Sequence, residues 1–185
     1  EEEENPKLAK DNEYTWKVYD QSSYKKNSVL FSIKRNKGSI NYFTWHNKGD
    51  FFGILGKNKE GKSTVHIHNL SSLQHFSPTS KNRGDIRSIS FHNTKPHFYV
   101  CSESNVYIYD LKQQELVKKF VSNLNPINHI SLHHEGSDFV AGSLSGKVAW
   151  FQSDLSDKPY LQMDQYHETK IKSLCFHNKF NLLSS

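Results

Sequence analysis

The chain contains one pattern four times, and each copy is centred on a histidine. The four histidines follow one another at spacings of 46, 41 and 44 residues. A β-propeller blade repeats at about 40–50 residues, so this spacing predicts blades. The apolar residues ahead of each histidine stand at the same offsets in every copy. The aligned sets are Ile40, Phe43, Trp45 and His46; Ile86, Ile89, Phe91 and His92; Ile127, Ile130, Leu132 and His133; and Ile171, Leu174, Phe176 and His177.

Each copy predicts a series of short strands. The last two apolar positions of each set alternate with polar or small residues, which is typical of a strand with one buried face. Four short strands per repeat make one propeller blade. A second strand is predicted at Phe52, Phe98, Phe139 and Leu183, and a third at Val65/Ile67, Val106/Ile108 and Val148/Trp150. The fourth is clearest at 115–121 and 159–166.

The predicted fold class is therefore all-β, a partial WD-repeat β-propeller of about three and a half blades. The Trp-Asp dipeptide that names WD repeats is replaced by His68-Asn69, Tyr109-Asp110 and Phe151-Gln152, so the prediction depends on the periodic pattern. We assign residues 1–27 to an acidic and polar linker and 28–185 to the propeller. The predicted blades span 39–83, 84–124 and 125–167, a further one starts at 168, and 29–33 forms a lone strand ahead of them.

We expect this chain to be structurally incomplete. A propeller closes with about 4–8 blades, and each blade buries its faces against its neighbours. Terminal blades without neighbours would expose apolar faces and unpaired strand edges, which favour association. We therefore expect either a longer native chain or support from a large assembly.

The charge balance restricts the partners only loosely. The formal net charge is +5 and the pI is about 9.0, which is compatible with nucleic-acid binding without demonstrating it. No apolar run approaches the roughly 20 residues of a membrane helix, and the acidic residues 1–4 are unlike a signal peptide or mitochondrial presequence. Cys101 and Cys175 stand in apolar stretches, so we predict two buried, reduced thiols and an intracellular compartment.

Eleven histidines raise the question of a metal site. A zinc site needs three or four convergent ligands, whereas the repeat explains the four aligned histidines as one structural position. The pairs His66/His68 and His133/His134 supply too few ligands by themselves, so we predict no metal and no cofactor. The sequence also has no G-x-S-x-G elbow and no glycine-rich phosphate loop. We therefore predict that the chain is not an enzyme.

Several segments inside the repeats resemble one protein family. They are WHNKGDFF from Trp45, VHIHNLS from Val65, FHNTKPHFYV from Phe91, VYIYDLKQQELVKKF from Val106 and GSLSGKVAWFQSDLSDKPY from Gly142. They resemble the propeller of the block-of-proliferation family of eukaryotic ribosome-biogenesis factors, over residues 40–185. The QELVKK and DLSDKPY turns are the most specific pieces, and the polar region 71–83 and Gln152 are departures.

This resemblance implies a ring of roughly seven blades and a non-catalytic scaffold in the nucleolus and nucleoplasm. It implies a role in maturation of the large-subunit and 5.8S ribosomal RNAs and in assembly of the large ribosomal subunit. The implied partners are a Pescadillo-family protein, a second WD-repeat assembly factor, pre-ribosomal RNA and the large-subunit precursor particle, with no membrane and no small-molecule substrate. The alternative is a generic WD-repeat interaction adaptor that binds no RNA.

Basic residues cluster in predicted loops and at strand ends, where they could contact phosphates. Such contacts are independent of base sequence and are weakened by salt. The residues that we predict first for contact with precursor ribosomal RNA are Lys34, Arg35, Lys37, Lys81, Arg83 and Arg87.

Overall fold

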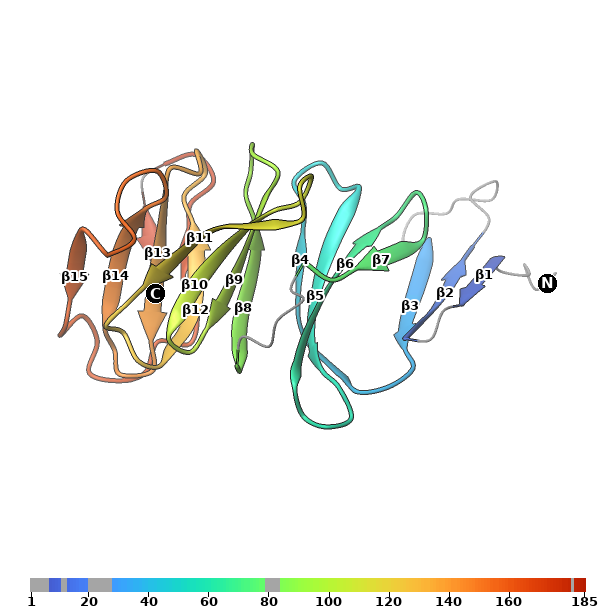
Figure 1. Ribbon diagram of the computed structural model, residues 1–185, viewed down its shortest axis with the longest axis horizontal. Helices are drawn as coiled ribbons and strands as arrows, with labels where there is room; N and C mark the ends of the chain where they lie inside the picture. Colours follow the sequence, from blue (N-terminus) through green and yellow to red (C-terminus); the bar gives the residue numbers. More distant parts are fainter. Residues whose placement is uncertain (1–6, 11–12, 20–27, 79–83, 181) are drawn as a thin grey trace.

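The computed structural model describes residues 7–10, 13–19, 28–78, 84–180 and 182–185. These residues form seventeen strands in five antiparallel sheets (Figure 1). The first sheet contains β1 (Lys7–Lys10), β2 (Tyr14–Val18) and β3 (Phe31–Arg35), and the last contains β16 (Cys175–Phe176) and β17 (Leu183–Ser184). No helix in the described part of the chain could cross a membrane.

Three sheets of four strands lie between these two. Blade 1 contains β4 (Ser39–Trp45), β5 (Phe51–Lys57), β6 (Ser63–Asn69) and β7 (Gln74–Phe76). Blade 2 contains β8 (Ile86–Phe91), β9 (His97–Ser102), β10 (Asn105–Asp110) and β11 (Glu115–Val121). Blade 3 contains β12 (Ile127–Leu132), β13 (Asp138–Ser143), β14 (Val148–Gln152) and β15 (Leu161–Met163).

The order of the strands and the contacts between sheets are those of a propeller. Within each blade the strands are hydrogen-bonded in chain order, so the first and fourth strands form opposite edges. The first strands of neighbouring sheets contact one another, β4 with β8, β8 with β12 and β12 with β16. The sheets therefore stand side by side (Figure 1), with the first strand of each blade packed against that of the next sheet. The predicted fold class, a partial β-propeller, is confirmed.

The core lies between the blades. Between blades 2 and 3, the rings of Phe139 and Phe151 stack with centroids 4.8 Å apart, and Phe120 packs edge-on against Phe139 at 5.0 Å. All three side chains are fully buried. Each of the other contacts between successive sheets has its own apolar cluster, so every shared face stabilises two neighbours.

The aligned apolar residues are buried in blade 2, and in blade 3 except for the partly buried Leu132, but they are exposed in blade 1. Ile40, Phe43 and Trp45 on β4 are between 43% and 47% exposed, whereas Ile86, Ile89 and Phe91 on β8 are buried. The reason is the composition of the preceding sheet. β3 leads directly to β4 and so takes the place of a fourth strand, and the described residues of that sheet supply no first strand to cover β4.

Part of the segment interpreted as a linker folds into β-strands. The division at residue 28 stays a prediction as a domain limit, but β1 and β2 both precede it, and β3 pairs with β2 instead of standing alone. Tyr14 and Trp16 alternate with polar residues and are buried against Phe52 and Ile54 of blade 1. This two-residue alternation is the sequence signal of the strand, and the polar flanking residues obscured it.

The two cysteines differ in environment, so the prediction of two buried thiols is wrong for one of them. Cys101 on β9 is fully buried, and this burial raises the pKa of its thiol. Cys175 is exposed, because β16 and β17 are the only strands that the described residues contribute to the last sheet. A sheet of two strands covers the face of β16 less completely than a blade of four.

Candidate binding surfaces

The four aligned histidines share one position in the backbone, as the repeat predicts. Each directly follows the first strand or its equivalent. Its backbone N–H donates to the carbonyl of the residue that opens the second strand or, for His177, to Leu182 just before β17. The His92 Nδ1 atom accepts the backbone N–H groups of Thr94 and Lys95, both at 3.0 Å. His177 Nδ1 does the same for Lys179 and Phe180 at 3.1 and 3.2 Å. In these two repeats the imidazole thus caps the turn between the first two strands, whereas Nδ1 of His46 lies 2.9 Å from the Asp50 carboxylate instead.

The turns are also joined from blade to blade. Because Nδ1 of His92 accepts hydrogen bonds, its proton is on Nε2, which donates to the carbonyl oxygen of Gly136 at 3.0 Å. The next residue, Asn93, donates its amide to the carbonyl of His134 at 2.8 Å. Asn47 of blade 1 makes the same bond to the Asn93 carbonyl. These bonds fix the histidine turns of three blades as one face of the molecule.

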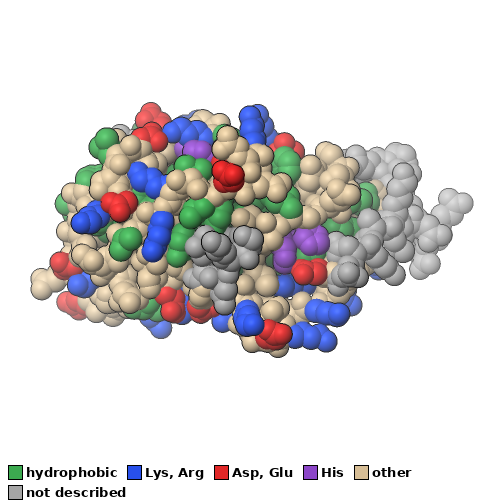
Figure 2. Space-filling model, viewed as in Figure 1, with side chains coloured by type: hydrophobic (Ala, Val, Ile, Leu, Met, Phe, Trp, Pro, Cys, Tyr) green, Lys and Arg blue, Asp and Glu red, His purple; other side chains and the backbone are tan. Residues whose placement is uncertain are grey.

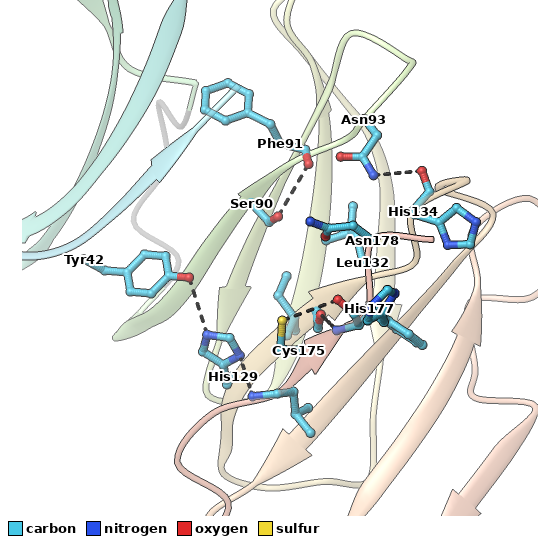
Figure 3. A pocket seen from close by; sticks show the side chains of 14 residues that line it. Tyr42, Ser90, Phe91, Asn93, His129, Leu132, His134, Cys175, His177 and Asn178 are labelled. Carbon is cyan, nitrogen blue, oxygen red and sulfur yellow. Dashed lines mark hydrogen bonds between the residues drawn. The ribbon is translucent and has the colours of Figure 1, made fainter. Parts of the chain in front are cut away.

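A polar cavity of about 250 Å³ lies between the first strands (Figure 3). Its labelled side chains come from four sheets, with Tyr42 on β4, Ser90 on β8, His129 on β12 and Cys175 on β16. The His129 ring lies between the Tyr42 hydroxyl, 3.5 Å from Nε2, and the backbone N–H of Leu174, 3.3 Å from Nδ1. Burial lowers the pKa of His129, so the ring is neutral at pH 7 and serves to join the blades.

The arrangement of possible nucleophiles bears on catalysis. The Cys175 thiol donates to the Phe176 carbonyl at 3.4 Å, and so its hydrogen-bond partner is not a histidine. The hydroxyl of Ser185 lies 2.6 Å from Nε2 of His167, but both groups are exposed at the surface. A nucleophile of this kind needs a base that a third group orients, inside a site that excludes water.

A second groove, of about 380 Å³, separates blades 1 and 2 on the face of the histidine turns. Its floor is apolar and comprises Phe51, Phe76, Phe91 and Leu111. Three lysines line the same groove, Lys48, Lys95 and Lys112, and Lys95 also contacts the Asp154 carboxylate at 3.2 Å. An apolar floor beside cationic side chains suits an extended segment that carries both an apolar anchor and negative charge.

The predicted RNA-binding residues fall into three groups in the structure. Lys34 near the end of β3 and Lys37 in the β3–β4 turn are exposed, and Lys81 and Arg83 lie outside the described residues. Arg35 is held within the fold, because its guanidinium donates to the Ser39 carbonyl at 2.6 Å and to the Thr64 hydroxyl at 2.8 Å.

Arg87 is paired with acidic residues. It contacts the carboxylates of Asp85 at 3.3 Å and of Glu103, and the hydrogen bond to Glu103 raises the pKa of Arg87. Asp85 also contacts Lys57 at 3.2 Å, and Lys57 pairs with Ser39, the residue that binds Arg35. These contacts bring Arg35 and Arg87 to one end of blades 1 and 2. This end lies at the lower edge of the view in Figure 2, where lysine and arginine side chains are mixed with acidic ones.

Sequence reasoning missed the lysines of the groove. Lys48 and Lys95 lie two and three residues after an aligned histidine, so their common place in the turn was a usable signal. Lys112 belongs to the turn between the third and fourth strands of blade 2, and its place beside the other two follows only from how the blades pack.

The repeated sheets, the histidine-capped turns and the bonds between blades define the chain as a WD-repeat-type β-propeller. No family model matches the sequence. The chain is 34% identical over 171 residues to ribosome biogenesis protein bop1-A of Xenopus laevis, an alignment that covers 92% of this chain and 23% of that protein. It is 30% identical over 180 residues to bop1 of Danio rerio, covering 97% of the chain and 23% of the relative.

A fungal relative gives the same result. Ribosome biogenesis protein ERB1 of Saccharomyces cerevisiae (strain YJM789) is 38% identical over 149 residues, which is 80% of this chain and 18% of that protein. The chain is therefore a homologue of the BOP1/ERB1 ribosome biogenesis proteins, and the resemblance to the block-of-proliferation family is confirmed. The chain spans 18–23% of the length of these relatives.

Proposed function

We propose that the chain is a non-catalytic scaffold in ribosome biogenesis. The observation that carries this proposal is the 30–38% identity to proteins named for ribosome biogenesis, which extends over most of the chain. In this role the chain supports maturation of the large-subunit and 5.8S ribosomal RNAs and assembly of the large subunit, in the nucleolus and nucleoplasm. A fold alone does not define a function, so the surfaces have to supply the binding.

Pre-ribosomal RNA is one partner in this proposal. Lys34 and Lys37 are the described candidates whose side chains are exposed, and Lys81 and Arg83 remain candidates on the basis of sequence. Arg35 and Arg87 contribute to the same end of the blades mainly by holding it together, since their guanidinium groups already have partners. RNA contact here is electrostatic and tolerant of sequence, because the lysines offer point charges to phosphates.

Protein partners are the other part of the proposal. A Pescadillo-family protein and a second WD-repeat assembly factor are the candidates, within a large-subunit precursor particle. The groove between blades 1 and 2 supports protein binding, since its apolar floor can take an anchor residue and its lysines can pair with acidic side chains. It lies at the histidine-turn end of the blades, whereas Lys34 lies near the end of β3 and Lys37 in the β3–β4 turn.

Depletion of the protein from cells that express it tests this role. We expect large-subunit precursor RNAs that contain the 5.8S sequence to accumulate, and mature large-subunit RNA to fall relative to small-subunit RNA. Re-expression of the wild-type sequence should restore the ratio. Unchanged precursor levels after full depletion would support the alternative, a WD-repeat interaction adaptor that binds no RNA.

A further inference from the structure

Three potential metal ligands converge where the first sheet packs on blade 1. They are Glu13, which directly precedes β2, His66 on β6 and His75 on β7. One ligand atom of each residue lies within 4.8 Å of those of the other two. Among the described residues, this is the one place where three such side chains meet. Figure 2 shows histidine side chains next to an acidic one at the surface in the region of β6 and β7.

The distances within the group already approach those of a metal complex. His66 Nε2 lies 3.2 Å from a carboxylate oxygen of Glu13. In a tetrahedral zinc site with bonds of about 2.0–2.1 Å, neighbouring ligand atoms are roughly 3.3 Å apart. The His66 and His75 rings are 5.0 Å apart and nearly perpendicular, at 82°, so both rings can direct a nitrogen at one point.

The residues around the group hold the ligands in place. The buried hydroxyl of Tyr14 lies 2.9 Å from Nδ1 of His66, on the opposite side of the ring from Glu13. With Nδ1 protonated and donating to this hydroxyl, Nε2 carries the lone pair that a metal needs. Metal-binding histidines usually have such a partner on the second nitrogen. The carbonyl of Glu13 accepts the backbone N–H of Asn36 at 2.7 Å, which anchors the third ligand to the residue that follows β3.

We propose that Glu13, His66 and His75 form a binding site for a divalent transition-metal ion, with Zn²⁺ as the best match. Two imidazoles and one carboxylate are a set that zinc accepts, and a fourth position remains for water or for a group from a partner. Glu13 is about half exposed, so this position is accessible to solvent. The bound ion joins the first sheet to blade 1.

This proposal departs from the sequence prediction of no metal site. The sequence argument required three convergent ligands and found His66 paired only with His68 on the same strand. The structure supplies His75 by pairing β7 with β6, and Glu13 by packing the first sheet on blade 1. Spacing does not reveal Glu13, which stands 53 positions before His66, and it does not show that β7 brings His75 alongside His66.

The competing interpretation is a simple ion pair between His66 and Glu13, with His75 as a neighbour. Zinc titration of the metal-free chain, followed by calorimetry and by thermal unfolding, separates the two. We expect one Zn²⁺ per chain and a higher melting temperature with zinc. Substituting Co²⁺ should give the visible absorption of a tetrahedral complex with nitrogen and oxygen ligands.

Variants then assign the ligands. Glu13→Gln and His75→Gln change partly exposed groups and should each weaken zinc binding by at least tenfold. Tyr14→Phe, which removes the hydroxyl beside Nδ1 of His66, should weaken zinc binding by about 10–100-fold. The matched control is Glu135→Gln, because Glu135 also pairs with a histidine, His134, at 3.9 Å, and lies outside the group. Absence of saturable zinc binding, or equal affinity in Glu13→Gln, His75→Gln and the parent, would overturn the proposal.

Discussion

Asn93 donates a hydrogen bond from its side-chain amide to the backbone carbonyl of His134 at 2.8 Å, and the two residues hold the same position in neighbouring blades. Both directly follow an aligned histidine. Asn47 makes the equivalent bond to Asn93, so an amide in each of blades 1 and 2 links a turn to the next. The repeat therefore encodes contacts between blades as well as the strands within them.

The first prediction concerns this link. Asn93→Ala should lower the free energy of unfolding by about 1 kcal/mol, because it removes one hydrogen bond between blades. Asn178→Ala is the matched control, since Asn178 follows the last aligned histidine and is exposed. Urea unfolding of both variants checks this. Equal losses in the two variants would show that the bond to His134 does not stabilise the fold.

The second prediction compares two glycines at the same turn position. Gly49 and Gly136 have φ of +76° and +78°, so an alanine is strained at either site. A Cβ on Gly136 would lie 2.1 Å from the His92 ring, whereas a Cβ on Gly49 would meet nothing within 4 Å. Gly136→Ala should therefore destabilise the chain by about 1–3 kcal/mol more than Gly49→Ala, as overpacking does. Equal melting temperatures would contradict the close contact of His92 with Gly136.

The third prediction is a loss of stability in mild acid. Burial lowers the pKa of His92, His97 and His129 below the ordinary histidine value. As the pH falls, the unfolded chain therefore binds protons before the folded chain does. The contribution of these neutral histidines to the free energy of unfolding is complete above about pH 6.5. It decreases as the pH falls from there towards the lower pKa values of the folded state. His92 adds to this effect because a proton on Nδ1 would face the N–H groups of Thr94 and Lys95.

Unfolding by urea at pH 8 and pH 5.5 measures this dependence. His92→Gln should be less stable at pH 8 and should lose less on acidification than the parent. His167→Gln, at an exposed site, should keep the parent's dependence. A parent chain that is equally stable at both pH values would contradict the account of the buried histidines.

The fourth prediction concerns RNA contact. Lys34→Glu with Lys37→Glu should weaken binding to a ribosomal RNA fragment and reduce the slope of log affinity against log salt, by about 0.7 for each lost contact to single-stranded RNA. Arg87→Gln should leave the slope unchanged, because its guanidinium already pairs with Asp85 and Glu103. Filter binding at several salt concentrations provides both values. An unchanged slope in the double lysine variant would exclude that turn as a contact.

Much of the fold follows from the sequence, because a blade is a local unit. The alternation that ends at each aligned histidine depends only on which face of a strand is buried, so it predicts β8, β12 and their neighbours. The same reasoning failed for Tyr14 and Trp16, whose strand is short and lies between polar segments. It also failed for Phe43 and Trp45, whose exposure depends on the sheet that precedes them.

The candidate sites were less predictable, because they depend on neighbours that are distant in the sequence. The sequence alone predicted that Arg87 is a cation available to contact RNA, but in the structure it pairs with Glu103. The groove lysines come from turns of two blades, and the ligands Glu13 and His66 come from two sheets. Spacing within one repeat indicates which residues share a turn, but the packing of one blade on the next decides which turns meet.

Purification of the tagged protein from cells, with quantification of the bound RNA, tests the proposed role in ribosome assembly most directly. The account predicts enrichment of precursors that contain the 5.8S and large-subunit sequences over small-subunit precursors, with the enrichment reduced by the double substitution at Lys34 and Lys37. Recovery of protein partners without any enrichment of large-subunit precursor RNA would contradict it.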